Sequence, residues 1–131
     1  MDDLKNQPQS PAAKRLSGKY PALTQNHLFL KVYGKGRSFA SGGLVLYVLR
    51  NYDRKTTLTG FTVSKSRGKA VTRNKIRRRM KEAYRSLYPL VKKGFLIVIV
   101  ARQSCEKYSS TQLRGQLYGL LKKAELFGIE N

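Results

Sequence analysis

The sequence predicts a small α+β protein, a two-layer sandwich in which one mainly antiparallel sheet packs against three helices. Two segments, 72–88 and 109–127, repeat their apolar residues at helical spacing, and the unbroken apolar run 95–100 has the composition of a buried strand. A chain of 131 residues fits one domain, since domains average about 150 residues. The predicted order of elements is helix, two or three strands, helix, strand, helix.

The first 22 residues are predicted to form a disordered leader, followed by one folded domain over 23–131. Three of the four prolines lie in this leader, with few bulky apolar side chains. Such a segment buries too little apolar surface to offset the entropy lost on ordering. The opening residues 1–5 include two acids and start no apolar stretch of the kind that secretion signals contain, so we expect a cytoplasmic protein.

The domain is expected to begin with a helix over 27–33, capped by Thr24 or Asn26. Two strands, 44–49 and 57–63, follow it. The linker between them is short, polar and turn-like, so we expect these two strands to pair antiparallel.

The second helix is predicted over 72–88, with Pro89 marking its end. The strand 95–100 shows no polar alternation, which favours a central strand covered on both faces. Ser109 or Ser110 can cap the third helix. The apolar stripes of the two helices are Ile76, Met80, Ala83 and Leu87 in the second, and Leu113, Leu117, Leu120, Leu121 and Ala124 in the third.

Charge limits the kind of partner. The chain has 27 Lys and Arg residues against 7 Asp and Glu, a formal charge of +20, so a polyanion such as nucleic acid is expected to bind it. A membrane is not expected as a partner, because the chain has no Trp, five scattered Phe and no apolar run long enough to cross a bilayer. No feature predicts an obligate protein partner.

The cations concentrate in one segment. Nine basic residues and a single acid, Glu82, lie between residues 67 and 85. At about 100° per residue, one edge of this helix, beside its apolar face, carries Arg73, Asn74, Arg77, Lys81, Tyr84 and Tyr88. Arginine forks bind phosphates, and tyrosines can stack on bases, so this edge is expected to face a ligand. The alternative is that the run only confers solubility or unspecific affinity.

Catalysis by the protein itself is not expected. The seven acids are scattered, whereas a two-metal nuclease gathers several carboxylates, and His27 is the only histidine available for acid and base work. The single cysteine, Cys105, is expected to be a small buried apolar residue.

The segment 61–85, FTVSKSRGKAVTRNKIRRRMKEAYR, resembles the signature of the bacterial ribonuclease P protein component, in which a strand ending in Val-Ser-Lys leads through Ala-Val-x-Arg-Asn-Arg into a basic helix. The likeness covers roughly residues 24–127. It includes Phe-x-x-Val-Tyr and Gly-x-Gly at 29–36, Leu-Val-Leu-Tyr at 44–47, and Ala101-Arg102 after the aliphatic strand. Lys75 stands where the family has the second arginine, which keeps the charge but loses the planar fork.

The resemblance implies a fold like that of ribosomal protein S5 domain 2, with a left-handed βαβ crossover that contains the basic helix. Parallel βαβ connections are right-handed in nearly all proteins, so sequence physics alone would favour the opposite hand.

The resemblance also implies a function: the non-catalytic protein subunit of ribonuclease P, which binds the catalytic RNA and the 5′ leader of precursor tRNA and promotes endonucleolytic removal of the leader. Hydrolysis would depend on Mg²⁺ held mainly by the RNA. The residues implied to meet the RNA subunit are Arg73, Asn74, Lys75, Arg77, Arg78 and Lys81, and we add Arg67 and Lys69 from the preceding loop. Those implied to contact leader nucleotides are Phe29, Tyr33 and Tyr47.

Two other functions share the basic composition. A ribosomal or ribosome-assembly protein would sediment with ribosomal subunits and leave tRNA processing unchanged. A sequence-neutral DNA-binding protein would bind random duplex DNA with comparable affinity at matched salt.

Overall fold

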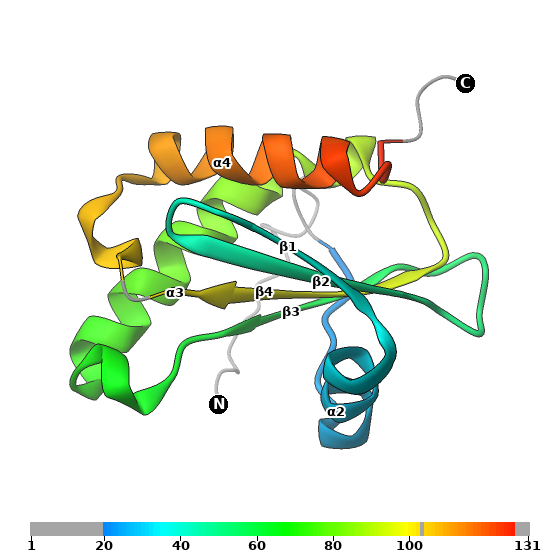
Figure 1. Ribbon diagram of the computed structural model, residues 1–131, viewed down its shortest axis with the longest axis horizontal. Coiled ribbons are helices and arrows are strands. Elements are labelled where there is room, and N and C mark those ends of the chain that lie inside the picture. The colour runs from blue at the N-terminus through cyan, green and yellow to red at the C-terminus, as the bar shows by residue number, and fades with distance from the viewer. Residues whose placement is uncertain (1–19, 103, 128–131) are drawn as a thin grey trace, which may run out of the picture.

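The computed structural model describes residues 20–102 and 104–127 (Figure 1). Most of the predicted leader lies outside these residues, so its disorder stays a prediction. The three expected helices are present in the described part. The elements are α2 (Asn26–Lys35), β1 (Arg37–Ser41), β2 (Leu44–Arg50), β3 (Leu58–Thr62), α3 (Ala70–Arg85), β4 (Phe95–Ala101) and α4 (Ser110–Lys123).

The strands form one mixed sheet in the order β1-β2-β4-β3. β2 pairs antiparallel with β1 and with β4, whereas β3 pairs parallel with β4. The prediction that 44–49 and 57–63 pair with each other is therefore wrong, because β4 lies between them. The prediction that 95–100 is central is confirmed.

Burial explains why β4 takes the central place. Its residues Leu96, Ile97, Val98 and Ile99 are all buried, two on each face of the sheet. A strand without polar positions gains from neighbours on both edges and cover on both faces. β3 contains Thr59 and Thr62 and lies at the edge of the sheet, so the short polar turn after β2 does not form a hairpin.

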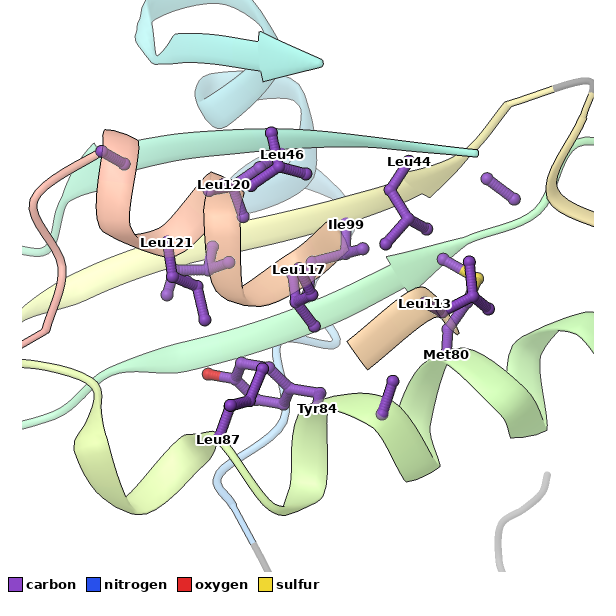
Figure 2. Close-up of a cluster of buried hydrophobic side chains, with 14 of the residues drawn as sticks. Leu44, Leu46, Met80, Tyr84, Leu87, Ile99, Leu113, Leu117, Leu120 and Leu121 are labelled. Atoms are coloured by element: carbon purple, nitrogen blue, oxygen red, sulfur yellow. The ribbon is translucent and has the colours of Figure 1, made fainter. Parts of the chain in front are cut away.

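The sheet has helices on both faces (Figure 1). α3 and α4 cover one face, where their predicted apolar stripes are confirmed as buried and pack against Leu44, Leu46 and Ile99 (Figure 2). α2 crosses the opposite face, where Val32 is fully buried against Leu96 and Val98. Because α2 is short, it covers this second face only in part.

The β3–α3–β4 unit is a βαβ crossover between neighbouring parallel strands. The structure thus contains the crossover that the family resemblance implied, and its left-handed sense stays a prediction. α3 begins and ends earlier than the predicted 72–88, and a 3₁₀ turn, Tyr88–Leu90, follows it with Pro89 inside. Ser109 caps α4, where Ser109 and Gln112 form a reciprocal capping box.

Residues immediately before position 23, the predicted start of the domain, already belong to the folded part. Ala22 forms a parallel bridge with Thr59 of β3. The Leu23 amide donates to the Thr59 carbonyl (2.9 Å), and the Thr59 amide donates to the Pro21 carbonyl (3.1 Å). Residues 20–22, assigned to the leader from sequence, therefore extend the sheet beyond β3, because an edge strand offers unpaired backbone groups.

Candidate nucleic-acid interface

The structure brings together the three predicted leader-contacting residues. The ring centroids of Phe29 and Tyr33, one turn apart on α2, lie 6.5 Å apart. The Tyr33 ring meets the Tyr47 ring of β2 edge-to-face, with centroids 5.0 Å apart. The Tyr33 hydroxyl also lies 2.9 Å from Oγ1 of Thr62 on β3. These three rings, here called the aromatic cluster, lie between α2 and the sheet and are partly exposed.

Local sequence explains this arrangement. Phe29 and Tyr33 share a face of α2 because they are four residues apart. Tyr47 alternates with buried residues along β2 and so points to the α2 side of the sheet. Gly60 allows Phe29 to lie directly on β3, because a Cβ at this position would come within 2.5 Å of the Phe29 ring.

The basic helix α3 contributes a second set of candidate residues. Lys69, Asn74, Lys75, Arg78 and Lys81 are exposed, and Arg73 and Arg77 are half-buried. The Arg73 Nε group donates to the Gly68 carbonyl (3.2 Å), and Arg77 donates to the Asn74 side-chain oxygen (2.9 Å). The second bond leaves the Asn74 amide NH₂ group as a donor. The side chain of Arg67 lies outside the described part.

Like charges follow one another along this helix. Arg73, Arg77 and Lys81 are spaced by four residues, which places them on one face. Partial desolvation and the neighbouring Arg73 lower the pKa of Arg77. The stem of Lys81 packs along the helix although the residue as a whole is exposed, and the resulting partial desolvation, together with Arg77, lowers the pKa of Lys81. An anion bound along this face would relieve both penalties, which favours a phosphate-bearing partner.

The aromatic cluster and the basic helix meet at one pocket. A hollow of about 190 Å³ at the edge of β3 is lined by Phe29 of α2 and by Arg77 and Lys81 of α3. Its remaining wall is formed by Tyr20, Ala22, Leu23, Thr24, Thr59, Gly60 and Phe61. One member of the aromatic cluster and two cations of α3 thus line the same hollow.

Sequence reasoning missed the contribution of Tyr20. Its ring lies 5.1 Å from that of Tyr84 and 5.9 Å from those of Phe61 and Tyr88, measured between centroids. No pattern signalled this role, because Tyr20 precedes Pro21 in a segment with a leader-like composition.

The expectation that Tyr84 lines the ligand-facing edge is wrong. Tyr84 is fully buried, and its hydroxyl lies 2.8 Å from Oγ1 of Thr59 (Figure 2). Burial raises its pKa. Tyr84 belongs to the core because Tyr20 and β3 cover this side of α3, and Tyr88 is half-buried beside it.

Arg79, one of the cations of the basic segment 67–85, has a structural role. Arg79 donates from Nη1 to the carbonyl oxygens of Glu106 (3.1 Å) and Tyr108 (3.3 Å) and so anchors the loop before α4. Cys105 in that loop is buried, as predicted.

The described part of the chain brings together no group of three or more His, Cys, Asp or Glu side chains. None of the described helices is long and apolar enough to span a bilayer.

Comparisons with known proteins agree with one another. The protein-family model described as Ribonuclease P matches residues 18–125. The ribonuclease P protein component of Symbiobacterium thermophilum is 39% identical over 98 residues, which cover 75% of this chain and 85% of the relative. That of Clostridioides difficile is 39% identical over 105 residues, covering 79% of this chain and 91% of the relative.

Two solved structures share the fold. The RNase P protein of Staphylococcus aureus is 31% identical with a TM-score of 0.74, and the match covers 84% of this chain and all of that one. The RNase P protein of Thermotoga maritima is 27% identical with a TM-score of 0.69, covering 84% of this chain and 98% of that one.

Proposed function

The chain belongs to the ribonuclease P protein family, and on that premise we propose which RNA each of its surfaces binds. As a ribonuclease P protein it is a subunit of an endoribonuclease of tRNA processing, and ribonuclease P RNA is its partner. Nothing in the comparisons favours the ribosomal alternative.

The aromatic cluster is proposed to bind the single-stranded 5′ leader of precursor tRNA. Rings that stand partly exposed on a sheet face suit unpaired bases, which stack on aromatic side chains at about 1–3 kcal/mol per base. Mature tRNA lacks the leader and would gain nothing from Phe29, Tyr33 and Tyr47. The protein would thus add affinity for substrate over product.

The exposed and half-buried cations of α3 are proposed to bind the RNA subunit. The proposed set comprises five cations of α3, its Asn74, and Arg67 and Lys69 from the loop before the helix; the α3 cations are Arg73, Lys75, Arg77, Arg78 and Lys81. The observation on which the whole proposal rests is the pocket at the edge of β3, which is lined by Phe29 of α2 and by Arg77 and Lys81 of α3. A leader leaving the aromatic cluster there would pass directly onto the cationic surface that holds the catalytic RNA.

Catalysis by ribonuclease P depends on metal, and we propose that the metal is Mg²⁺ held mainly by the RNA. The described residues present cations rather than a carboxylate cluster. Those cations would lower phosphate repulsion between the RNA subunit and the precursor and so reduce the Mg²⁺ concentration required. We place this reaction in the cytoplasm.

The test is cleavage of 5′-labelled precursor tRNA by a bacterial ribonuclease P RNA at low Mg²⁺, with and without the protein. The proposal expects cleavage at the mature 5′ end only when the protein is added, and no cleavage by the protein alone. It also expects the protein to increase affinity for precursor tRNA more than for mature tRNA. An equal increase for both would refute leader binding.

A further inference from the structure

Lys81 brings a primary amine to the pocket at the edge of β3. The volume of this pocket, about 190 Å³, is below the roughly 300–1,000 Å³ of sites that hold drug-sized ligands. The apolar residues Leu23, Phe29 and Phe61 are part of its walls. A lysine amine thus borders a hollow that suits a small molecule with an apolar part.

Arg77 is the second cation of this pocket, and it lies one helical turn before Lys81 on α3. Nη1 of Arg77 donates to the Asn74 side-chain oxygen (2.9 Å), which orients the guanidinium. A guanidinium has five N–H donors, and this bond uses one of them. The planar fork of an arginine matches two oxygens of a phosphate group, so Arg77 can hold a phosphate beside the Lys81 amine.

No acid competes for these two cations within the pocket. Among the described residues that line it, none is Asp or Glu. The hydroxyl of Thr59, another lining residue, lies 2.8 Å from the hydroxyl of the buried Tyr84 and is engaged in the core. Arg77 and Lys81 are therefore the charged groups that a ligand meets, and the pocket favours a small anion.

The surroundings of Lys81 also activate its amine as a nucleophile. Partial desolvation and the charge of Arg77 lower the pKa of Lys81. Only an uncharged amine can attack an electrophile, so a lower pKa increases the reactive fraction near neutral pH. Desolvation and a neighbouring cation are the two means by which proteins activate lysine nucleophiles.

We propose that Lys81 is a site of covalent acylation by small acyl phosphates, with the phosphate held by Arg77 and the acyl group against the apolar wall. In this reaction Nζ of Lys81 attacks the acyl carbon. An N–C bond forms, and the C–O bond between the acyl carbon and the phosphate breaks. The phosphate leaves with the bonding electron pair and takes up the proton that the nitrogen releases. Holding the donor next to the amine raises its effective concentration.

The product is an uncharged amide, so acylation removes one cation from the surface of α3. Lys81 is among the residues proposed to bind the RNA subunit, and the modified protein should therefore bind ribonuclease P RNA less tightly. This consequence rests on the proposed function, whereas the modification itself does not. Because bound RNA would cover Lys81, acylation should act on the free protein and so regulate assembly of the holoenzyme.

The test is acetylation of the full-length protein by acetyl phosphate in the absence of RNA, followed at each lysine by mass spectrometry. Lys75 is the internal reference, because it is an exposed lysine of the same helix that does not line the pocket. Lys81 is expected to react about tenfold faster than Lys75. Inorganic phosphate should slow the reaction of Lys81 but not that of Lys75, because it competes for Arg77.

Two variants test the role of the arginine. Arg77→Gln is expected to lower the acetylation rate of Lys81 about tenfold. Arg85→Gln is the matched control, because Arg85 lies four residues after Lys81, as Arg77 lies four before it, but is exposed and does not line the pocket. The Arg85→Gln protein should react as the parent does. Circular dichroism verifies that both variants are folded.

The proposal is overturned if Lys81 reacts no faster than Lys75, or if Arg77→Gln and Arg85→Gln change its rate equally. An uncharged donor, the N-hydroxysuccinimide ester of acetic acid, adds a check, since inorganic phosphate should not slow its reaction with Lys81. Failure of the proposed function would appear separately. Ribonuclease P RNA added beforehand would then not protect Lys81, although the free protein would still be acetylated there.

Discussion

The rings of Tyr33 and Tyr47 lie edge-to-face with their centroids 5.0 Å apart, although one belongs to α2 and the other to β2. The hydroxyl of Tyr33 reaches a third element, because it lies 2.9 Å from Oγ1 of Thr62 on β3. Tyr33 is still 37% exposed. The ring is thus both oriented by the fold and open to a ligand, which reduces the entropy lost on binding.

Removing either ring should weaken precursor binding selectively. Tyr33→Ala or Tyr47→Ala in the holoenzyme is expected to lower affinity for precursor tRNA about tenfold, since a stacked base contributes ~1–3 kcal/mol. Affinity for mature tRNA should not change. Tyr118→Ala is the control, because Tyr118 is a comparably exposed tyrosine on α4. Parallel losses for precursor and mature tRNA would contradict the assignment.

Arg78→Ala should weaken binding of ribonuclease P RNA without destabilising the protein. Arg78 is exposed on α3, so its removal costs little packing. If it contacts one phosphate, the slope of log K against log salt should fall by about 1. Affinity titrations at several salt concentrations provide the measurement. An unchanged slope would remove Arg78 from the RNA-binding set.

Arg79→Ala should destabilise the protein and leave its RNA affinity unchanged, the opposite of what is expected for the adjacent Arg78→Ala. Its guanidinium bonds the Glu106 and Tyr108 carbonyls, so its loss should lower the free energy of unfolding by about 1 kcal/mol. Urea denaturation measures this loss. RNA affinity should stay near the parent value at temperatures where the variant is folded, and a drop in the salt slope there would contradict the structural role.

Tyr84→Phe should destabilise the protein by about 1 kcal/mol, because it leaves the buried Thr59 hydroxyl without the partner that now lies at 2.8 Å. The double variant Tyr84→Phe/Thr59→Val removes both groups and should lose less than the sum of the two single variants. Tyr52→Phe, at a fully exposed ring, should change nothing. Strict additivity in denaturation experiments would show that the bond contributes no coupling.

Cys105 should make stability depend on alkaline pH. Burial raises the pKa of its thiol from 9.0 to about 11 in the folded protein. The contribution of the protonated Cys105 thiol to the free energy of unfolding is complete below the pKa of the thiol in the unfolded chain. It is lost as the pH rises through the pKa of the thiol in the folded protein, because only the unfolded thiol ionises between these two values. The free energy of unfolding should therefore fall from about pH 9 upward. Cys105→Ala should flatten this slope, and an unchanged slope would assign it to other groups.

Much of the fold follows from patterns that act over a few residues. The spacing of Leu113, Leu117 and Leu120 predicts one buried face, and the sequence offers Ser109 or Ser110 as the cap of this helix; the three leucines are buried and Ser109 is the cap. The unbroken aliphatic run of β4 indicated its central place. Helical stripes and caps depend on neighbours three or four residues away, so the sequence displays them directly.

The strand order could not be derived in the same way. A short polar turn after β2 favours a hairpin with the next strand, yet β4 lies between β2 and β3. Which strand pairs with β2 depends on the relative stability of pairings between strands that are distant in sequence. The most apolar strand, β4, takes the central position because it can be covered on both faces.

For the interface, the cationic helix, the aromatic residues near it and the family to which they point can all be read from the sequence. Which of these side chains are exposed depends on the packing of segments that are distant in sequence. Tyr84 lies about 40° from the predicted apolar face of α3, and the segment at Tyr20 covers it, whereas Arg79 is engaged by backbone carbonyls near α4. The position of a side chain around a helix is a local property, but its exposure depends on which distant segment packs beside it.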